Sequence, residues 1–164
     1  MGMGIWSMHF IGMLAFRLPV PMSYDVSITL LSLLIAVVVS AFALYTVSRE
    51  RLGLGRLLRG GLIMGAGIAS MHYTGMAAMR MGATVRYHPE LLALSIGIAV
   101  VASWAALWMA FRLRGNSLPS DVRRKAGSAL LMGAAICGMH YTGMAAAIFP
   151  AHRMATNVVP AMPV

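Results

Sequence analysis

The sequence predicts an all-α protein, a polytopic transmembrane helix bundle with five spans. Of its 164 residues, 60% are hydrophobic and only 10% are charged, and the mean hydropathy is +0.80. A soluble domain of this size carries about 25% charged residues, so the chain is too poor in charge to fold surrounded by water. The apolar residues form five runs separated by short polar segments, and three of the runs contain the same short motif.

The first two runs cover residues 1–16 and 26–48. Run 1–16 ends at Arg17-Leu18-Pro19, is slightly shorter than the roughly 20 residues that a span needs, and lacks the features of a signal peptide. We interpret it as a spanning helix that has lost its beginning. Run 26–48 has neither a charge nor a glycine and is the clearest span.

The last three runs cover residues 60–79, 91–111 and 126–149. Runs 60–79 and 126–149 are rich in glycine and alanine, which allows close helix contact in lipid, whereas run 91–111 is bulky and aliphatic. A motif helix followed by a plain helix is therefore the repeating unit. We expect a membrane domain over 1–150, truncated at its N-terminus, and a proline-containing tail over 151–164 that begins a missing continuation.

The charges indicate how the helices cross the membrane. The net charge is +9, and most of the arginines and lysines lie in the segments 49–59 and 112–125. The positive-inside rule places these two segments in the cytoplasm, so the motif helices all run outward. No basic face carries interleaved aromatics, which argues against a nucleic-acid partner; the lipid bilayer is the expected surrounding.

The three motifs are the candidate functional residues. They read Met8-His9-Phe10-Ile11-Gly12-Met13, then Met71-His72-Tyr73-Thr74-Gly75-Met76, then Met139-His140-Tyr141-Thr142-Gly143-Met144. A histidine is costly inside a membrane, and residues four apart share one face of a helix. Each motif therefore presents an imidazole and a thioether together. The predicted metal ligands are His9, His72, His140, Met13, Met76 and Met144, with Met8, Met71 and Met139 as further candidates.

The chemistry of these ligands favours copper. Imidazole suits copper, zinc and iron, whereas a thioether selects Cu(I). No carboxylate lies at the depth of the motifs, which argues against magnesium and calcium. We therefore predict one or two copper ions. The hydroxyls of four motif residues are predicted to orient the rings by hydrogen bonds: Tyr73, Tyr141, Thr74 and Thr142.

Three other interpretations stay open. A single buried histidine or methionine commonly serves helix packing, although three copies at one depth favour a metal. A copper transporter or channel would show ligands at several depths. A haem protein would use two of the histidines as axial ligands. The single cysteine, Cys137, excludes an internal disulfide, and the spans offer no catalytic set, so we expect a non-enzyme.

The motifs at 71–76 and 139–144 resemble the signature of the MHYT domain, and the motif at 8–13 resembles its first copy with Phe10 and Ile11 substituted. The resemblance covers nearly the whole chain. It implies a multi-pass sensor in the bacterial cytoplasmic (inner) membrane, which responds to a diatomic gas (O2, CO or NO) or to redox state through copper. It also implies signalling to a cytoplasmic output domain, a cyclic-di-GMP enzyme or a histidine kinase, that is absent from this sequence. A homodimer is one assembly that we expect for such a domain.

Overall fold

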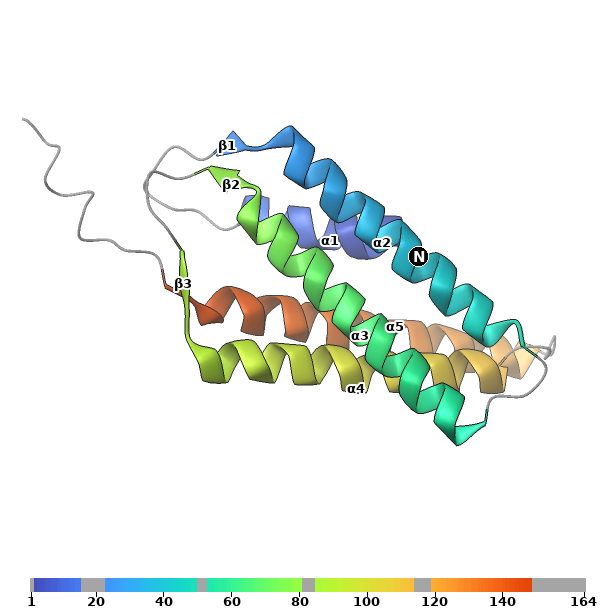
Figure 1. Ribbon diagram of the computed structural model, residues 1–164. Coiled ribbons are helices and arrows are strands. Elements are labelled where there is room, and N and C mark those ends of the chain that lie inside the picture. The colour runs from blue at the N-terminus through green and yellow to red at the C-terminus, as the bar shows by residue number, and fades with distance from the viewer. Residues whose placement is uncertain (1, 16–22, 50–52, 81–84, 114–118, 149–164) are drawn as a thin grey trace, which may run out of the picture.

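The computed structural model describes residues 2–15, 23–49, 53–80, 85–113 and 119–148. These residues form a helix bundle, so the predicted all-α class is confirmed (Figure 1). The helices are α1 (Gly2–Ala15), α2 (Val26–Val47), α3 (Leu54–Ala77), α4 (Pro89–Leu113) and α5 (Pro119–Ala146). Four two-residue strands accompany them: β1 (Ser23–Tyr24), β2 (Met79–Arg80), β3 (Arg86–Tyr87) and β4 (Ala147–Ile148). The predicted tail, 151–164, lies outside the described residues.

The two helices that follow basic segments start earlier than the sequence predicted. Helix α3 begins at Leu54 rather than at residue 60, and α5 begins at Pro119 rather than at residue 126. Arginine and lysine are good helix formers, so the charges continue the helices instead of ending them. Gly53 provides an extended N-cap for α3, and a proline is well tolerated in the first turn of α5.

Motif helices and plain helices alternate through the bundle. Helix α2 packs against α1 and α3, and α4 packs against α3 and α5 (Figure 1). The motif helices α1, α3 and α5 touch one another far less than α3 and α5 touch their plain neighbours. The predicted pairing of motif helix with plain helix is therefore present in space, and α3 lies at its centre.

Two short antiparallel ribbons were not predicted. Strand β1 pairs with β2, and β3 pairs with β4. Each ribbon ties the end of a motif helix to the start of a plain helix, and each is continued by a backbone hydrogen bond of 2.8 Å, from Asp25 to Ala78 and from His88 to Ala146. The labelled strands lie at one end of the bundle, opposite the starts of α3 and α5 (Figure 1).

Three of the helices are long and apolar enough to cross a membrane: α2, α4 and the Val122–Ala146 part of α5. Helix α1 is apolar but has 14 residues. Helix α3 carries arginines and many glycines, and it has an extensive buried face. Because α3 lies between α2 and α4, it needs less apolar surface toward lipid than they do. The chain is thus a membrane protein.

Two apolar clusters lie at different levels of the bundle. The inner cluster includes Met64, Ile68, Leu107 and Met139. The outer cluster consists of Met13, Met76, Met79 and Met144, and it lies nearer the ribbons. Along α3, Met64 and Ile68 precede His72 and Met76 follows it. His72 therefore lies between the two clusters.

Candidate metal centre

Three histidines, one from each motif helix, meet in the interior of the bundle. His9 is 1% exposed, His72 is 0% exposed and His140 is 1% exposed. Their Nδ1 atoms face one another: the separations are 3.1 Å from His9 to His140, 3.1 Å from His72 to His9 and 3.3 Å from His140 to His72. The sequence predicted this convergence, and the structure brings all three residues together.

The spacing of the Nδ1 atoms fits a metal ion. Dividing their mean separation by √3 puts each nitrogen about 1.8 Å from the common centre, close to the roughly 2.0 Å of a metal–imidazole bond. When neutral imidazoles carry their proton on Nε2, the Nδ1 lone pairs point at one another. Such a set of converging lone pairs favours a cation at the centre.

The outer nitrogens of the same rings have no polar partner. Nε2 of each of the three histidines is buried and makes no hydrogen bond. Metal-binding histidines usually donate this second N–H to a carboxylate, a carbonyl or water. Here Nε2 instead lies against the glycine of another motif. The ring orientation is therefore set by packing.

The methionines four residues after the histidines form one buried group. Met13 and Met76 are 1% exposed and Met144 is 8% exposed, and all three belong to the outer cluster. Tyr24 and Tyr87 pack over this cluster from the ribbon strands β1 and β3. The thioethers are thus gathered one helical turn beyond the imidazoles, as the spacing of each motif predicted.

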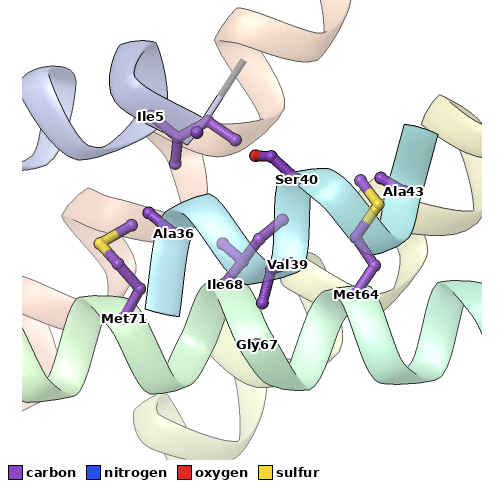
Figure 2. Close-up of a pocket in the computed structure, with 10 residues that line it drawn as sticks. Ile5, Ala36, Val39, Ser40, Ala43, Met64, Gly67, Ile68 and Met71 are labelled. Atoms are coloured by element: carbon purple, nitrogen blue, oxygen red, sulfur yellow. The ribbon is translucent and has the colours of Figure 1, made fainter. Parts of the chain in front are cut away.

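The methionines that precede the histidines lie elsewhere. Met139 packs in the inner cluster, and Met8 is half-buried. Met71 lines a small apolar cavity between α1, α2 and α3, together with Met64 and Ile5 (Figure 2). Figure 2 shows Met71 and Met64 both extending from α3 toward α2. Of the predicted methionines, only those that follow the histidines therefore gather in one group.

Tyr73 supports the site differently from the prediction. Its hydroxyl lies 2.6 Å from Ser95 Oγ on α4, and Ser95 in turn donates to the Leu92 carbonyl. The Tyr73 hydroxyl is therefore the donor to Ser95, and it makes no bond to an imidazole. Its ring meets the His72 ring edge-on, with centroids 4.9 Å apart. Tyr73 positions His72 by ring contact.

The other three predicted supports also lack hydrogen bonds to the imidazoles. Tyr141 is 62% exposed and contacts His140 through its ring, at a centroid distance of 5.2 Å. The Thr142 hydroxyl donates to the Gly138 carbonyl of its own helix, at 2.8 Å. A threonine hydroxyl inside a helix commonly bonds to the carbonyl four residues back, which explains the difference. Thr74 is half-buried.

Sequence reasoning missed the residues that surround the motifs. Tyr24 and Tyr87 occupy equivalent places in the repeat, as do Ser32 and Ser95. Ser32 accepts a hydrogen bond of 3.0 Å from the Trp6 indole, whereas Ser95 receives its bond from Tyr73. Burial raises the pKa of the Tyr24 hydroxyl above its ordinary value. The same repeat that revealed the histidines would have revealed these pairs.

A family model described as "Bacterial signalling protein N terminal repeat", MHYT, matches residues 2–60, 65–119 and 133–162. The first matched segment holds α1 and α2, the second holds the motif-bearing part of α3 and all of α4, and the third begins seven residues before His140. The resemblance seen in the sequence is confirmed.

Several curated bacterial proteins are similar to this chain over most of its length. The bifunctional diguanylate cyclase/cyclic di-GMP phosphodiesterase MucR of Pseudomonas aeruginosa is 63% identical, over 92% of this chain and 22% of its own length. The cyclic di-GMP phosphodiesterase NbdA of the same organism is 48% identical, over 90% and 19%. The signaling protein YkoW of Bacillus subtilis is 43% identical, over 91% and 19%. The chain spans about a fifth of these relatives, and no solved structure matches it.

Proposed function

We propose, from the premise that this chain belongs to the MHYT family of bacterial signalling proteins, that it is a copper-dependent sensor domain of the bacterial inner membrane. It crosses that membrane several times and responds to a diatomic gas (O2, CO or NO) or to redox state. It passes the response to a cytoplasmic output, a cyclic-di-GMP enzyme or a histidine kinase. The relatives MucR and NbdA are named as cyclic-di-GMP enzymes, which supports the choice of output.

One observation carries the proposal: three buried imidazoles point their Nδ1 atoms at a single centre. His9, His72 and His140 hold the ion, and the thioethers of the outer cluster favour Cu(I) over harder metals. Bound copper would supply a one-electron couple and a coordination position for a small gas. The apolar surroundings keep water out of the centre, which strengthens every electrostatic interaction there.

The same geometry suggests how the signal leaves the site. The three motif helices make few contacts with one another, and the histidines are one place where they meet. A change in the spacing of the rings therefore moves α1, α3 and α5 relative to each other, and α2 and α4 follow because they pack against them. An ion or gas biases this equilibrium only to the extent that it binds one arrangement more tightly.

The test is metal content after purification in detergent. We expect about one copper ion per chain in the wild type, and loss of that copper in His72→Ala and His140→Ala, because each variant removes one of three converging ligands. His88→Ala is the matched control, since His88 is exposed and lies beside the ribbon. Wild-type protein that stays metal-free after incubation with Cu(I), together with triad variants that are less stable than the wild type, would support helix packing instead.

A copper transporter is the second candidate, because sulfur ligands occur above and below the imidazoles. Met64 and Met139 lie in the inner cluster, and Met13 and Met76 lie in the outer one. Cu(I) flux into proteoliposomes that depends on His72 would favour transport over sensing. Haem is disfavoured, because Nδ1 atoms 3.1–3.3 Å apart leave no room for a macrocycle between any two rings.

A further inference from the structure

Each histidine ring of the triad rests on a glycine that belongs to a different motif. A Cβ atom added at these glycines would meet the Nε2 atom of the facing imidazole. The distances would be 2.2 Å from Gly75 to His9, 2.4 Å from Gly143 to His72 and 2.5 Å from Gly12 to His140. Separations under 3.0 Å are essentially never seen for real Cβ atoms, so no other residue type fits at these three positions without movement.

The contacts form a closed cycle. The histidine of the first motif sits on the glycine of the second, that of the second on the glycine of the third, and that of the third on the glycine of the first. The motif spacing His-x-x-Gly thus serves two different neighbours: the histidine faces one motif helix and the glycine receives the ring of another. Every motif helix is held by the other two.

The cycle of contacts also sets which nitrogen of each ring faces the other two imidazoles. Nε2 is pressed against helix backbone and has no hydrogen-bond partner, which leaves Nδ1 to point inward. In most metal sites a hydrogen bond to the second nitrogen fixes the ring orientation. Here the contact with the glycine fixes the ring orientation.

We propose that Gly12, Gly75 and Gly143 are positioning residues of the metal centre, which present Nδ1 of the neighbouring motif's histidine to the ion. Their role in presenting Nδ1 to an ion rests on the function proposed above. The contacts between rings and glycines do not depend on that function. A side chain introduced at one of these three positions displaces the histidine ring of another motif. Alanine at Gly75 displaces His9 and leaves His72 in place.

Other glycines of the same helices provide matched controls. A Cβ atom at Gly4 in α1, Gly55 in α3 or Gly138 in α5 would have nothing within 4 Å. Gly→Ala at those positions changes the helix in the same chemical way without touching a ring. The comparison therefore separates the ring contact from the general effect of replacing a glycine.

The first experiment measures Cu(I) affinity by competition with a chromophoric chelator, in detergent. We expect G75A, G143A and G12A each to weaken binding at least tenfold, and G55A, G138A and G4A to stay within about twofold of the wild type. Wild-type affinity in G75A and G143A would overturn the proposal. This comparison of affinities decides the positioning role whenever the wild type binds Cu(I).

The second experiment needs no metal. Thermal midpoints of the metal-free protein are compared for G75A alone, in an H9A background and in an H72A background. We expect G75A to lower the midpoint by about 4 °C or more in the wild-type and H72A backgrounds, and to lower it no further once the His9 ring is gone. An equal loss in all three backgrounds would overturn the cycle.

The two experiments also separate this inference from the proposed function. If the wild type binds no copper and the midpoints behave as expected, the ring contacts stand and the copper sensor fails. If copper binds and the losses are equal in all backgrounds, the sensor stands and the positioning role fails.

Discussion

At each histidine of the triad, one ring nitrogen faces the two other imidazoles and the other faces a helix backbone. Under the proposed function, this arrangement would let the centre bind a cation without any carboxylate. Because the rings are 0–1% exposed, water does not compete for the Nδ1 lone pairs. We propose that the thioethers of the outer cluster are the next ligands and that they select among metals.

The outer thioethers are tested by Met76→Leu. Leucine keeps nearly the volume of methionine, so the fold is expected to lose less than about 1.5 kcal/mol. Removing a soft ligand is expected to weaken Cu(I) binding about tenfold, while zinc binding changes little. Chelator competition with each metal measures both effects.

Met64→Leu is the control for this experiment. Met64 is equally buried on the same helix but belongs to the inner cluster. Equal losses of Cu(I) affinity in M64L and M76L would contradict the assignment of Met76 as a ligand.

At the scale of elements, close approach of α3 to α4 holds the central motif helix in place. A Cβ atom at Gly65 would lie 2.6 Å from Val100 Cα, a backbone atom that cannot turn aside. We expect Gly65→Ala to push the two helices apart, with a cost of about 1–3 kcal/mol and a lower thermal midpoint. Gly97→Ala on α4 is the control, because nothing lies within 4 Å of its Cβ position. A midpoint unchanged in G65A would contradict this packing.

The start of α2 depends on the charge of Asp25. Its carboxylate accepts a hydrogen bond from the Ile28 N–H at 3.0 Å and pairs with Arg80 of β2. The Arg80 guanidinium, followed by the Ile28 N–H, holds the pKa of Asp25 below its ordinary value of 3.8. A lowered pKa contributes stability that is present above the ordinary value and is lost as the pH falls through the lowered one.

Asp25→Asn isolates that charge, because asparagine is also a good N-cap residue. We expect the wild type to have the higher thermal midpoint at pH 7 and the difference to shrink as the pH falls below 3.8. The measurement is a series of melts of both proteins from pH 7 downward. A difference that stays constant over the whole series would show that the ion pair with Arg80 contributes nothing.

At the scale of the whole molecule, the repeat explains the bundle and also where its symmetry ends. Tyr73 of the second motif is covered by Tyr87 and Ser95, and Phe10 of the first motif meets Tyr24 in the same way. Tyr141 of the third motif is 62% exposed, and within the described residues no plain helix follows α5. Among the residues that the structure describes, the third motif therefore shares the histidine centre without the covering seen at the other two.

The orientation of the bundle is a further prediction. The ribbon end is expected outside the inner membrane and the starts of α3 and α5 in the cytoplasm. In a Cys137→Ser background, a membrane-impermeant maleimide is expected to label Ser23→Cys in intact spheroplasts. It is expected to label Gly53→Cys only after permeabilisation. The reverse pattern would contradict the assigned orientation.

Much of this arrangement follows from the sequence, because it depends on periodicity and repetition. Three equal motifs in parallel helices lead directly to His9, His72 and His140 meeting at one level, with Met13, Met76 and Met144 one turn beyond. The ribbons and the role of Gly75 do not follow in that way. They depend on contacts between helices far apart in the chain, and a motif read alone assigns its glycine to its own histidine. The hydrogen bond of Tyr73 does not follow from its motif either, since its partner Ser95 lies on another helix.

In the proposed function, three imidazoles of this chain hold one copper ion through Nδ1. X-ray absorption at the copper edge of the Cu(I)-loaded protein tests it most directly. We expect the imidazole scattering pattern with about three nitrogens near 2.0 Å, and loss of that pattern in His72→Ala. A copper environment without imidazole scattering, or one unchanged in His72→Ala, would contradict the claim.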